Sequence, residues 1–387
     1  MTQVHEDATI DERFRSVVDL FASYLGEEGF SAQLSVRWRG ELVVDVAGGP
    51  AVTPTSITGV YSVSKGVAAL ALATLFDDGR LVLDEPVATY WPEFAAGGKE
   101  SVTVRQLLSH QAGLPVVEGK NELRTLLESE LGARRLAAQR PLWRPGTAFG
   151  YHAATIGVLM EELVRRVTGG TLQQLYETQV RAPREADFYL GLPESVDARY
   201  VPVENVRPSA AQSAELASRP PLDALAERVF DNFGVPDDRS SSGFSTNNVG
   251  MRRAGPAAVG GVGSARGLAR LYADALPGAE NPIAGAATFE AMAQQQVWGA
   301  DRTLNVPNAF GVVFMLPQPR MPFAGLGAFG HDGAGGALAF ADPTTAISFG
   351  YIPIPMQYPG GADFRSVALA RLVRQIVAEE AGAAGGQ

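Results

Sequence analysis

The stretch Tyr61-Ser-Val-Ser-Lys-Gly66 places a lysine three residues after a serine. The chain has three lysines among 32 basic residues, so it carries almost all of its positive charge on arginine. Arginine stays charged at any accessible pH, whereas a buried lysine amine can lose its proton and act as a base. Because residues i and i+3 share one face of a helix, we expect the Lys65 amine to reach the Ser62 hydroxyl. An activated serine nucleophile needs this arrangement.

The serine is predicted to open a helix. Apolar residues continue at helical spacing from Ser62 to Phe76, and Gly79 ends the pattern. Upstream, residues 14–25 show the same period, which predicts an amphipathic helix. Two alternating apolar runs at 33–38 and 42–47 follow that helix and predict a β-hairpin.

The remainder of the chain changes character twice. Residues 102–169 have a mostly helical pattern, and 187–263 are rich in Pro, Ser and Asp, which predicts an irregular segment that covers a pocket. Strand patterns then return, and a final helix is expected over 362–380. The late strands are expected at 310–316, 337–341 and 346–352, the last two joined by the turn Asp342-Pro-Thr-Thr345.

Strands at both ends of the chain with helices between them predict an α/β fold of the α+β kind. The expected architecture is a central antiparallel sheet flanked by terminal helices, with a mostly helical domain inserted. We place the sheet domain at 1–60 and 290–387, and the helical domain, which includes a pocket-covering segment at 187–255, at 61–289. A cleft between the two is the natural place for a site.

Composition excludes several classes of function. The net charge of −10 and the absence of a long basic run argue against nucleic acid as a partner. There is no cysteine, and the four histidines are widely spaced, so we expect no metal and no other cofactor. The most apolar stretch, 67–76, is too short to span a membrane, and the N-terminus is polar. We therefore expect a soluble, cytoplasmic protein; its oligomeric state is left open.

Three separated segments resemble, in chain order, the three motifs of the serine β-lactamase and penicillin-binding-protein superfamily. They are Ser62-Val-Ser-Lys65, Tyr151-His152-Ala153 and His331-Asp332-Gly333. The nearest resemblance is to the family VIII carboxylesterases, which look like class C β-lactamases. It extends from about residue 33 to residue 351 and is weakest between 187 and 255. The resemblance implies a β-lactamase/transpeptidase-like fold.

The resemblance also implies a set of catalytic roles. Ser62 would attack an acyl carbon to give an acyl-enzyme, and Lys65 and Tyr151 would share the proton transfers. Either of the two is left open as the effective base, because coupled groups titrate as a set. The backbone N–H groups of Ser62 and Ala334 would form the oxyanion hole.

Two departures from the β-lactamase motifs bear on the substrate. Ala153 and His331 stand where β-lactamases have Asn and Lys, which help to hold a lactam and its carboxylate. Because histidine is only partly charged near neutrality, it anchors a carboxylate poorly, and the site should favour neutral esters. His331, Asp332 and Gly333 are expected to bind substrate. His152 is expected either to contact substrate or only to pack.

The sequence therefore predicts a serine carboxylesterase whose partner is a small-molecule ester of small to medium size. Alternatives are acyl transfer from the same acyl-enzyme, β-lactamase or D-amino-acid peptidase activity, and an inactive penicillin-recognising fold that serves as a binding protein. Ser64 and His110 are expected to be structural. The chain has no Gly-x-Ser-x-Gly, which excludes the nucleophile elbow of α/β-hydrolases.

Overall fold

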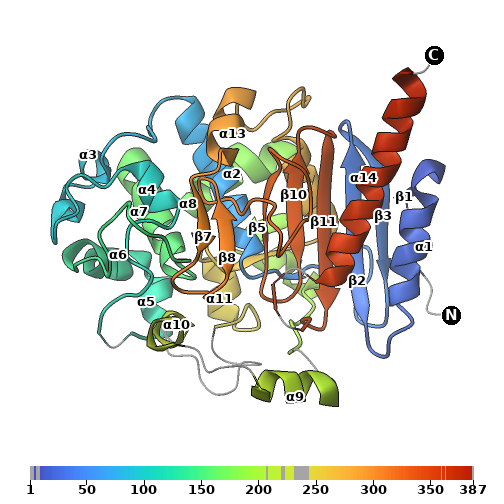
Figure 1. Cartoon of the computed structure of the whole chain (residues 1–387), viewed down its shortest axis with the longest axis horizontal. Coiled ribbons are helices and arrows are strands. Elements are labelled where there is room, and N and C mark those ends of the chain that lie inside the picture. The colour runs from blue at the N-terminus through green and yellow to red at the C-terminus, as the bar shows by residue number, and fades with distance from the viewer. Residues whose placement is uncertain are drawn as a thin grey trace.

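The computed structural model contains a helical half and a sheet half that lie side by side (Figure 1). It describes residues 4–5, 9–119, 121–205, 208–218, 223–230, 244–358, 360–361 and 363–385. Parts of the predicted pocket-covering segment 187–255 lie outside these ranges. The division into domains at 1–60, 61–289 and 290–387 stays a prediction.

Both ends of the chain build the main antiparallel sheet, as the sequence predicts. Its order is β1-β3-β2-β11-β10-β9, so the N-terminal hairpin pairs directly with the last strand. Leu34 lies opposite Tyr351 at this junction. The strands are β1 Thr9–Ile10, β2 Ser31–Trp38, β3 Glu41–Gly48, β9 Phe329–Asp332, β10 Leu338–Asp342 and β11 Ile347–Ile354.

Alternating side chains on β11 decide which helix packs on which face of the sheet. Phe349 and Tyr351 belong to an apolar cluster with the terminal helices α1, Arg15–Tyr24, and α14, Phe364–Gly385. The residues between them are small: Ser348 donates to the Ala269 carbonyl at 2.8 Å, and Gly350 lies against the first turn of α12, Ala265–Ala273. Because strand residues alternate between faces, the sheet is covered by helices on both sides.

The helical half is built around α2, Val63–Asp77, which is buried on nearly all sides. A helix that is apolar all round belongs in the centre of a core, and α7 Thr155–Thr168, α8 Leu172–Tyr176 and α13 Ala286–Ala293 contact it. The helices not yet named are α3 Val87–Tyr90, α4 Val104–Leu108, α5 Leu123–Leu127, α6 Ser129–Ala138, α9 Ala210–Ser218, α10 Ala224–Phe230 and α11 Val249–Ala254. Of these, α9 lies at the lower end of the molecule in Figure 1, away from α2.

Two expectations about the strands are wrong. The segment 187–263 is not irregular throughout, because β5, Phe188–Leu190, and β6, Gly261–Gly263, join β4, Thr58–Gly59, in a three-stranded sheet. Strands of two or three residues are too short to show alternation in sequence. The predicted strand 310–316 also fails.

The apolar run at 310–316 folds back on itself. Only its first residue lies in a strand, β8 Pro307–Phe310, which pairs with β7 Val297–Ala300. Phe310 then forms a bridge with Met315, and Val313 adopts a positive φ of 66° between them. The run is apolar because it is buried, and it contributes to both cores.

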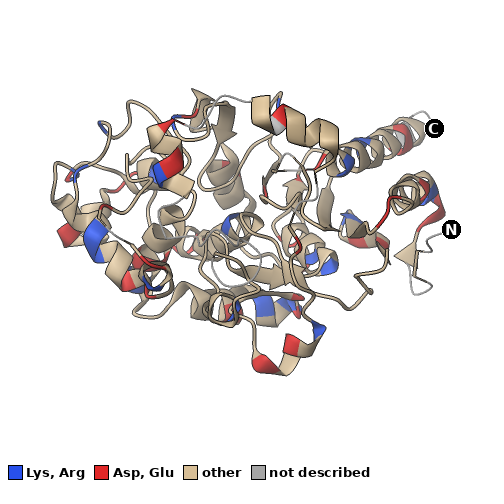
Figure 2. Ribbon diagram, turned by 90° about the horizontal axis from the view of Figure 1, so that it is seen from below, with Lys and Arg blue, Asp and Glu red and all other residues tan. Residues whose placement is uncertain are grey.

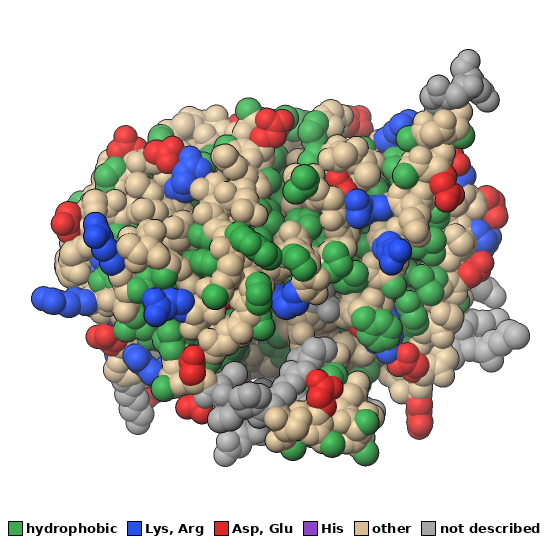
Figure 3. Space-filling model, viewed as in Figure 1, with side chains coloured by type: hydrophobic (Ala, Val, Ile, Leu, Met, Phe, Trp, Pro, Cys, Tyr) green, Lys and Arg blue, Asp and Glu red, His purple; other side chains and the backbone are tan. Residues whose placement is uncertain are grey.

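Charges of both signs are interspersed on the surface rather than segregated, as the views from two sides show (Figures 2 and 3). No helix in the described part of the chain is long and apolar enough to cross a bilayer. The cytoplasmic location expected from the sequence stays a prediction.

Replacing Gly350 with alanine is expected to destabilise the fold. The added Cβ would lie 2.3 Å from the Ala265 carbonyl oxygen, so α12 would have to move away from the sheet. Overpacking of this kind costs about 1–3 kcal/mol. Thermal unfolding should show a lower midpoint for Gly350→Ala. Gly26→Ala is the control, because its Cβ would meet the Ser23 carbonyl at an ordinary 3.6 Å; equal midpoints for the two variants would refute the packing argument.

Candidate active site

A tight turn between β4 and α2 presents Ser62. Ser62 is the N-cap residue directly before α2, and Tyr61 before it has a positive φ of 48°, which residues with a side chain rarely adopt. Ser64 holds this turn, because its hydroxyl donates to the Tyr61 carbonyl at 2.5 Å and accepts from the Gly261 N–H at 2.9 Å. Ser64 is therefore structural, as predicted, and Ser62 opens the helix.

The Lys65 amine lies where the sequence predicts it. Its Nζ is 2.9 Å from the Ser62 Oγ and donates to the Ala258 carbonyl oxygen, also at 2.9 Å. The side chain is completely buried. Burial lowers the pKa of the Lys65 amine well below its ordinary value, and the negative charge of Asp332 offsets only part of this effect. Burial therefore favours the neutral amine, which has a lone pair available to the serine hydroxyl.

A buried carboxyl group supports the carbonyl that holds Lys65. The Ala257 N–H donates to Glu161 at 2.8 Å, which fixes the loop that carries the Ala258 carbonyl. Gly157 lets α7 approach this loop, since a Cβ there would lie 2.7 Å from the Ala258 nitrogen. The sequence analysis missed these residues. Ala258 acts through its main chain, so no side-chain pattern could have indicated it.

Tyr151 completes the cluster around Ser62. The centroid of its ring is 4.9 Å from the Lys65 Nζ, and its side chain forms a hydrogen bond with Ser62. Burial raises the pKa of the Tyr151 phenol well above its ordinary value of 10, and the hydrogen bond with Ser62 acts in the opposite direction but is outweighed. Tyr151 is therefore a neutral phenol in the resting protein.

Neighbours that the sequence analysis did not find fix the position of Tyr151. Its N–H donates to the buried Asp301 carboxylate at 3.0 Å, and Thr303 donates to its carbonyl at 2.9 Å. Phe310 stacks on the ring with centroids 5.8 Å apart and an interplanar angle of 12°. Asp301 and Thr303 lie about 150 residues from Tyr151 in sequence and show no motif, so only the fold reveals them.

The third predicted segment brings His331 and Asp332 to the same place. The His331 ring is 6.0 Å from the Tyr151 ring, and its Nδ1 lies 2.7 Å from the Asp332 carbonyl oxygen and 3.5 Å from the Asp332 carboxylate. Burial lowers the pKa of His331, although Asp332 acts against this. His331 is therefore neutral near pH 7 and donates from Nδ1, which leaves Nε2 as an acceptor without a partner among the described residues.

Gly333 has a different role from the one expected. A Cβ at this position would lie 2.2 Å from the Val60 carbonyl oxygen, so the glycine allows the third segment to lie directly on the nucleophile turn. The third segment, which carries Ala334, therefore lies against Val60 and Val63, on either side of Ser62 in the chain. Within the described ranges, neither the Ser62 N–H nor the Ala334 N–H donates a hydrogen bond. Two free donors from adjacent segments are what an oxyanion hole requires.

His152 packs and has no ring nitrogen left for substrate. Its Nε2 accepts from the Leu114 N–H at 2.9 Å, and its Nδ1 donates to the Gly150 carbonyl at 2.6 Å. Of the two roles considered for His152, the structure supports packing and corrects its inclusion among the substrate-binding residues. His110 is also structural, since its Nδ1 accepts the His152 N–H at 3.1 Å.

Burial thus favours the neutral forms of Lys65, Tyr151 and His331, and the Asp332 carboxylate acts electrostatically on all three. Over the described part of the chain, no three His, Asp or Glu side chains are grouped so that they could share a metal ion.

Comparison with known proteins agrees with this geometry. The sequence model of the Beta-lactamase family matches residues 19–364. The chain belongs to the Beta-lactamase family. The resemblance inferred from the three motifs and the predicted β-lactamase/transpeptidase-like fold are both confirmed for this family member.

Three relatives resemble this Beta-lactamase-family chain over nearly its whole length. Esterase/beta-lactamase LipL of Mycobacterium tuberculosis is 32% identical over 393 residues, which cover 95% of this chain and 88% of LipL. The structure of EstA from Arthrobacter nitroguajacolicus Rue61a is 43% identical, covers 98% of this chain and 100% of EstA, and superimposes with a TM-score of 0.88. A family VIII carboxylesterase is 31% identical, with a TM-score of 0.81 and coverage of 97% and 100%.

The buried His152 is expected to make the fold sensitive to acid. Burial lowers its pKa from 6.5 to about 4, so below pH 6.5 the unfolded chain binds a proton that the folded chain does not. Stability should therefore fall as the pH falls through this range, and His152 should contribute about 2 kcal/mol of the loss between about pH 7.5 and about pH 5. Urea unfolding at both pH values measures the loss.

His152→Gln keeps a donor and an acceptor but cannot titrate, so it should lose about 2 kcal/mol less over the same interval, whatever its stability at pH 7.5. His5→Gln, a substitution far from this network, is the control and should behave like the wild type. An equal loss in His152→Gln and the wild type would contradict the assignment.

Proposed function

We propose that this chain is a serine carboxylesterase that hydrolyses small to medium, uncharged carboxylic esters through an acyl-enzyme on Ser62. The observation that carries the proposal is the 2.9 Å separation between the Ser62 Oγ and the Nζ of a fully buried Lys65. A neutral amine at this distance can accept the hydroxyl hydrogen. The similarity to the esterase/beta-lactamase LipL and to a family VIII carboxylesterase supports the same class of activity.

The geometry suggests one order of bond changes. As the Ser62 oxygen bonds to the ester carbonyl carbon, its proton passes to Lys65, and the N–H groups of Ser62 and Ala334 bind the negative carbonyl oxygen. The alcohol then leaves with a proton that returns from the lysine through Tyr151. Water attacks the acyl-enzyme in the same way, giving its proton to Lys65, and release of the acid restores the Ser62 hydroxyl.

Lys65 is the better candidate for the base. Burial lowers the pKa of Lys65 and raises the pKa of Tyr151, so it favours the neutral form of both groups. A neutral amine accepts a proton, but a neutral phenol must first donate one. We therefore assign Tyr151 the transfer of protons between Lys65 and the reacting oxygen.

The preference for esters over anionic lactams follows from His331 and Ala153. His331 is neutral because burial lowers its pKa, so it offers no charge to a substrate carboxylate. Ala153 has no amide with which to bind a lactam side chain. Two of the groups that hold a lactam in β-lactamases are therefore missing.

Ser62→Ala is expected to abolish hydrolysis of p-nitrophenyl acetate and butyrate, with a loss of about 10⁴-fold or more, because it removes the nucleophile. Release of p-nitrophenol measures the rate. Ser23→Ala, which changes an exposed serine on α1, is the control and should leave the rate unchanged. Undiminished turnover in Ser62→Ala would overturn the proposed function.

Lys65→Arg is expected to lower kcat roughly 10²–10⁴-fold, since the guanidinium keeps the charge but cannot serve as a base. The rate is measured per folded molecule, with folding followed by circular dichroism. Lys99→Arg is a matched control, because Lys99 is also buried but donates only to the carbonyls of Ala96, Ala137 and Gln139. Comparable rates for Lys65→Arg and the wild type would exclude Lys65 as the base.

A further inference from the structure

One side of Ser62 is closed and the other is open. Lys65 and His331 are fully buried behind it, and Tyr151 is nearly so. On the other side Tyr61 is partly accessible and Ala334 is exposed. A substrate must therefore approach Ser62 from the side of Tyr61 and Ala334.

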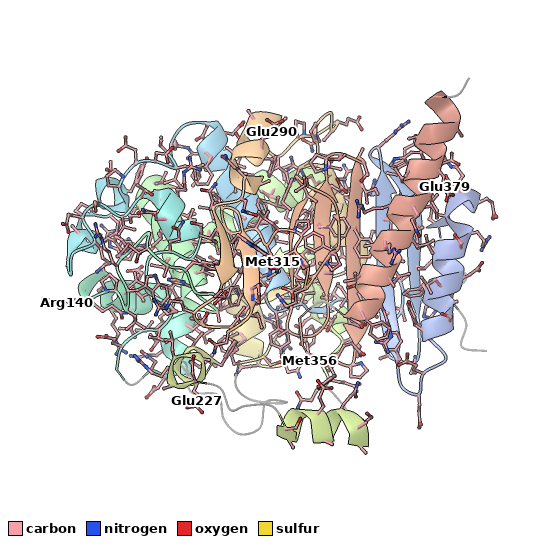
Figure 4. The ribbon with its side chains drawn as sticks, in the orientation of Figure 1. Arg140, Glu227, Glu290, Met315, Met356 and Glu379 are labelled. Carbon is pink, nitrogen blue, oxygen red and sulfur yellow. The ribbon has the colours of Figure 1, made fainter. Side chains whose placement is uncertain are left out.

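A pocket lies on this open side; together with the open solvent at its mouth, its space is about 280 Å³. Tyr61, which precedes Ser62, and Gly335, which follows Ala334, are both in its lining, so the pocket reaches the neighbours of the two free N–H groups. The remaining lining residues are Thr58, Gly59, Val60, Val203, Glu204, Ala337, Ile352, Pro353, Ile354 and Met356. The lower end of the main sheet, on the side where α9 lies, carries Met356 (Figure 4).

The outer wall of the pocket is held firmly in place. Asn247 clamps Val203, accepting from its N–H at 2.8 Å and donating to its carbonyl at 2.8 Å. The Met356 N–H donates to the Glu204 carbonyl at 2.9 Å. Val203 and Glu204 belong to the segment that the sequence predicts to cover a pocket. The hydrogen bond from Met356 joins this segment to the chain just after β11.

The chemistry of the lining selects the kind of group that fits. Among the described residues that line the pocket, most side chains are aliphatic and none is a lysine, arginine or histidine. Glu204 is the one charged residue among them, and its charge disfavours an anionic group. The pocket is a small hollow that is open to solvent, so it suits a small group.

We propose that this pocket is the subsite for a short, uncharged, aliphatic part of the ester, and that Val203 and Met356 determine its length. The assignment rests on the proposed function. The group is either the acyl chain or the alcohol part, since both are attached to the carbonyl carbon and present the same kind of apolar surface.

Two variants change the pocket in opposite directions. Met356→Ala deepens it and keeps the backbone bond to Glu204, whereas Val203→Phe fills it and keeps the clamp by Asn247. One methylene in an apolar pocket changes specificity by about 10-fold or more. The ratio of kcat/KM for a six-carbon chain to that for a two-carbon chain should therefore rise about 10-fold in Met356→Ala and fall about 10-fold in Val203→Phe.

Two substrate series distinguish the acyl chain from the alcohol. The first varies the acyl group, from p-nitrophenyl acetate to hexanoate, and the second varies the alcohol, from ethyl to hexyl acetate. A change of ratio in one series only identifies the group that occupies the pocket. Val82→Ala, at an exposed position, is the control and should alter neither ratio.

The outcomes separate this inference from the function on which it rests. If hydrolysis still depends on Ser62 but neither variant alters either ratio, the subsite is overturned and the esterase proposal stands. Labelling by methyl and hexyl p-nitrophenyl phosphonates, followed by mass spectrometry, repeats the comparison without turnover. If Ser62 is not labelled by either reagent and no ester is hydrolysed, the proposed function and the subsite both fall.

Discussion

The site depends on a lysine amine that is buried without an acidic partner. Within the described residues Lys65 has two polar contacts, the Ser62 hydroxyl and the Ala258 carbonyl, and neither carries a charge. An ammonium ion in such surroundings would lose most of its hydration with little compensation, so the neutral amine is the stable form. The fold thus favours an uncharged amine through burial. Any change that admits water to the amine would raise its pKa and weaken it as a base.

The charge that appears during reaction is placed where Asp332 can stabilise it. When the Ser62 proton moves to Lys65, an ammonium forms in a buried site, and the nearby carboxylate favours it. The same carboxylate disfavours a phenolate at Tyr151, as does Asp301, which holds the tyrosine main chain. The acidic residues therefore direct the proton toward the lysine, and the phenol stays neutral between transfers.

The sequence predicts the parts of this protein that depend on local pattern. The hairpin, the final strands β10 and β11, the buried helix α2 and the three motifs all show a period or a spacing that a short window contains. The sequence does not show contacts made through the main chain or between distant segments. Ala258 serves by its carbonyl, and Asp301 binds Tyr151 across about 150 residues.

Packing also gives some residues a role that their type does not indicate. Gly333 leaves room for the Val60 carbonyl, which lies against it. Both ring nitrogens of His152 form hydrogen bonds with backbone groups. The strand predicted at 310–316 fails for a similar reason. Its residues are apolar because they are buried in two cores, and the chain reverses direction between them. A buried turn can therefore have the same apolar sequence pattern as a buried strand.

The halves of the site come from different parts of the fold and meet through glycines. Ser62 and Lys65 lie at the start of the central helix α2, whereas His331 lies in β9 of the main sheet and Ala334 follows that strand. At Gly66, a Cβ would lie 2.2 Å from the Tyr272 hydroxyl oxygen and 3.3 Å from the His331 Cβ, and Gly333 lies equally close to Val60. The contact at Gly333 cannot be relieved by changing a rotamer, because the Val60 carbonyl belongs to the backbone, whereas at Gly66 the neighbours are the side chains of Tyr272 and His331. The position of Ser62 relative to Ala334 therefore depends on how helix and sheet pack. Under the proposed function, the sheet built from both ends of the chain helps to place the nucleophile and the oxyanion donors.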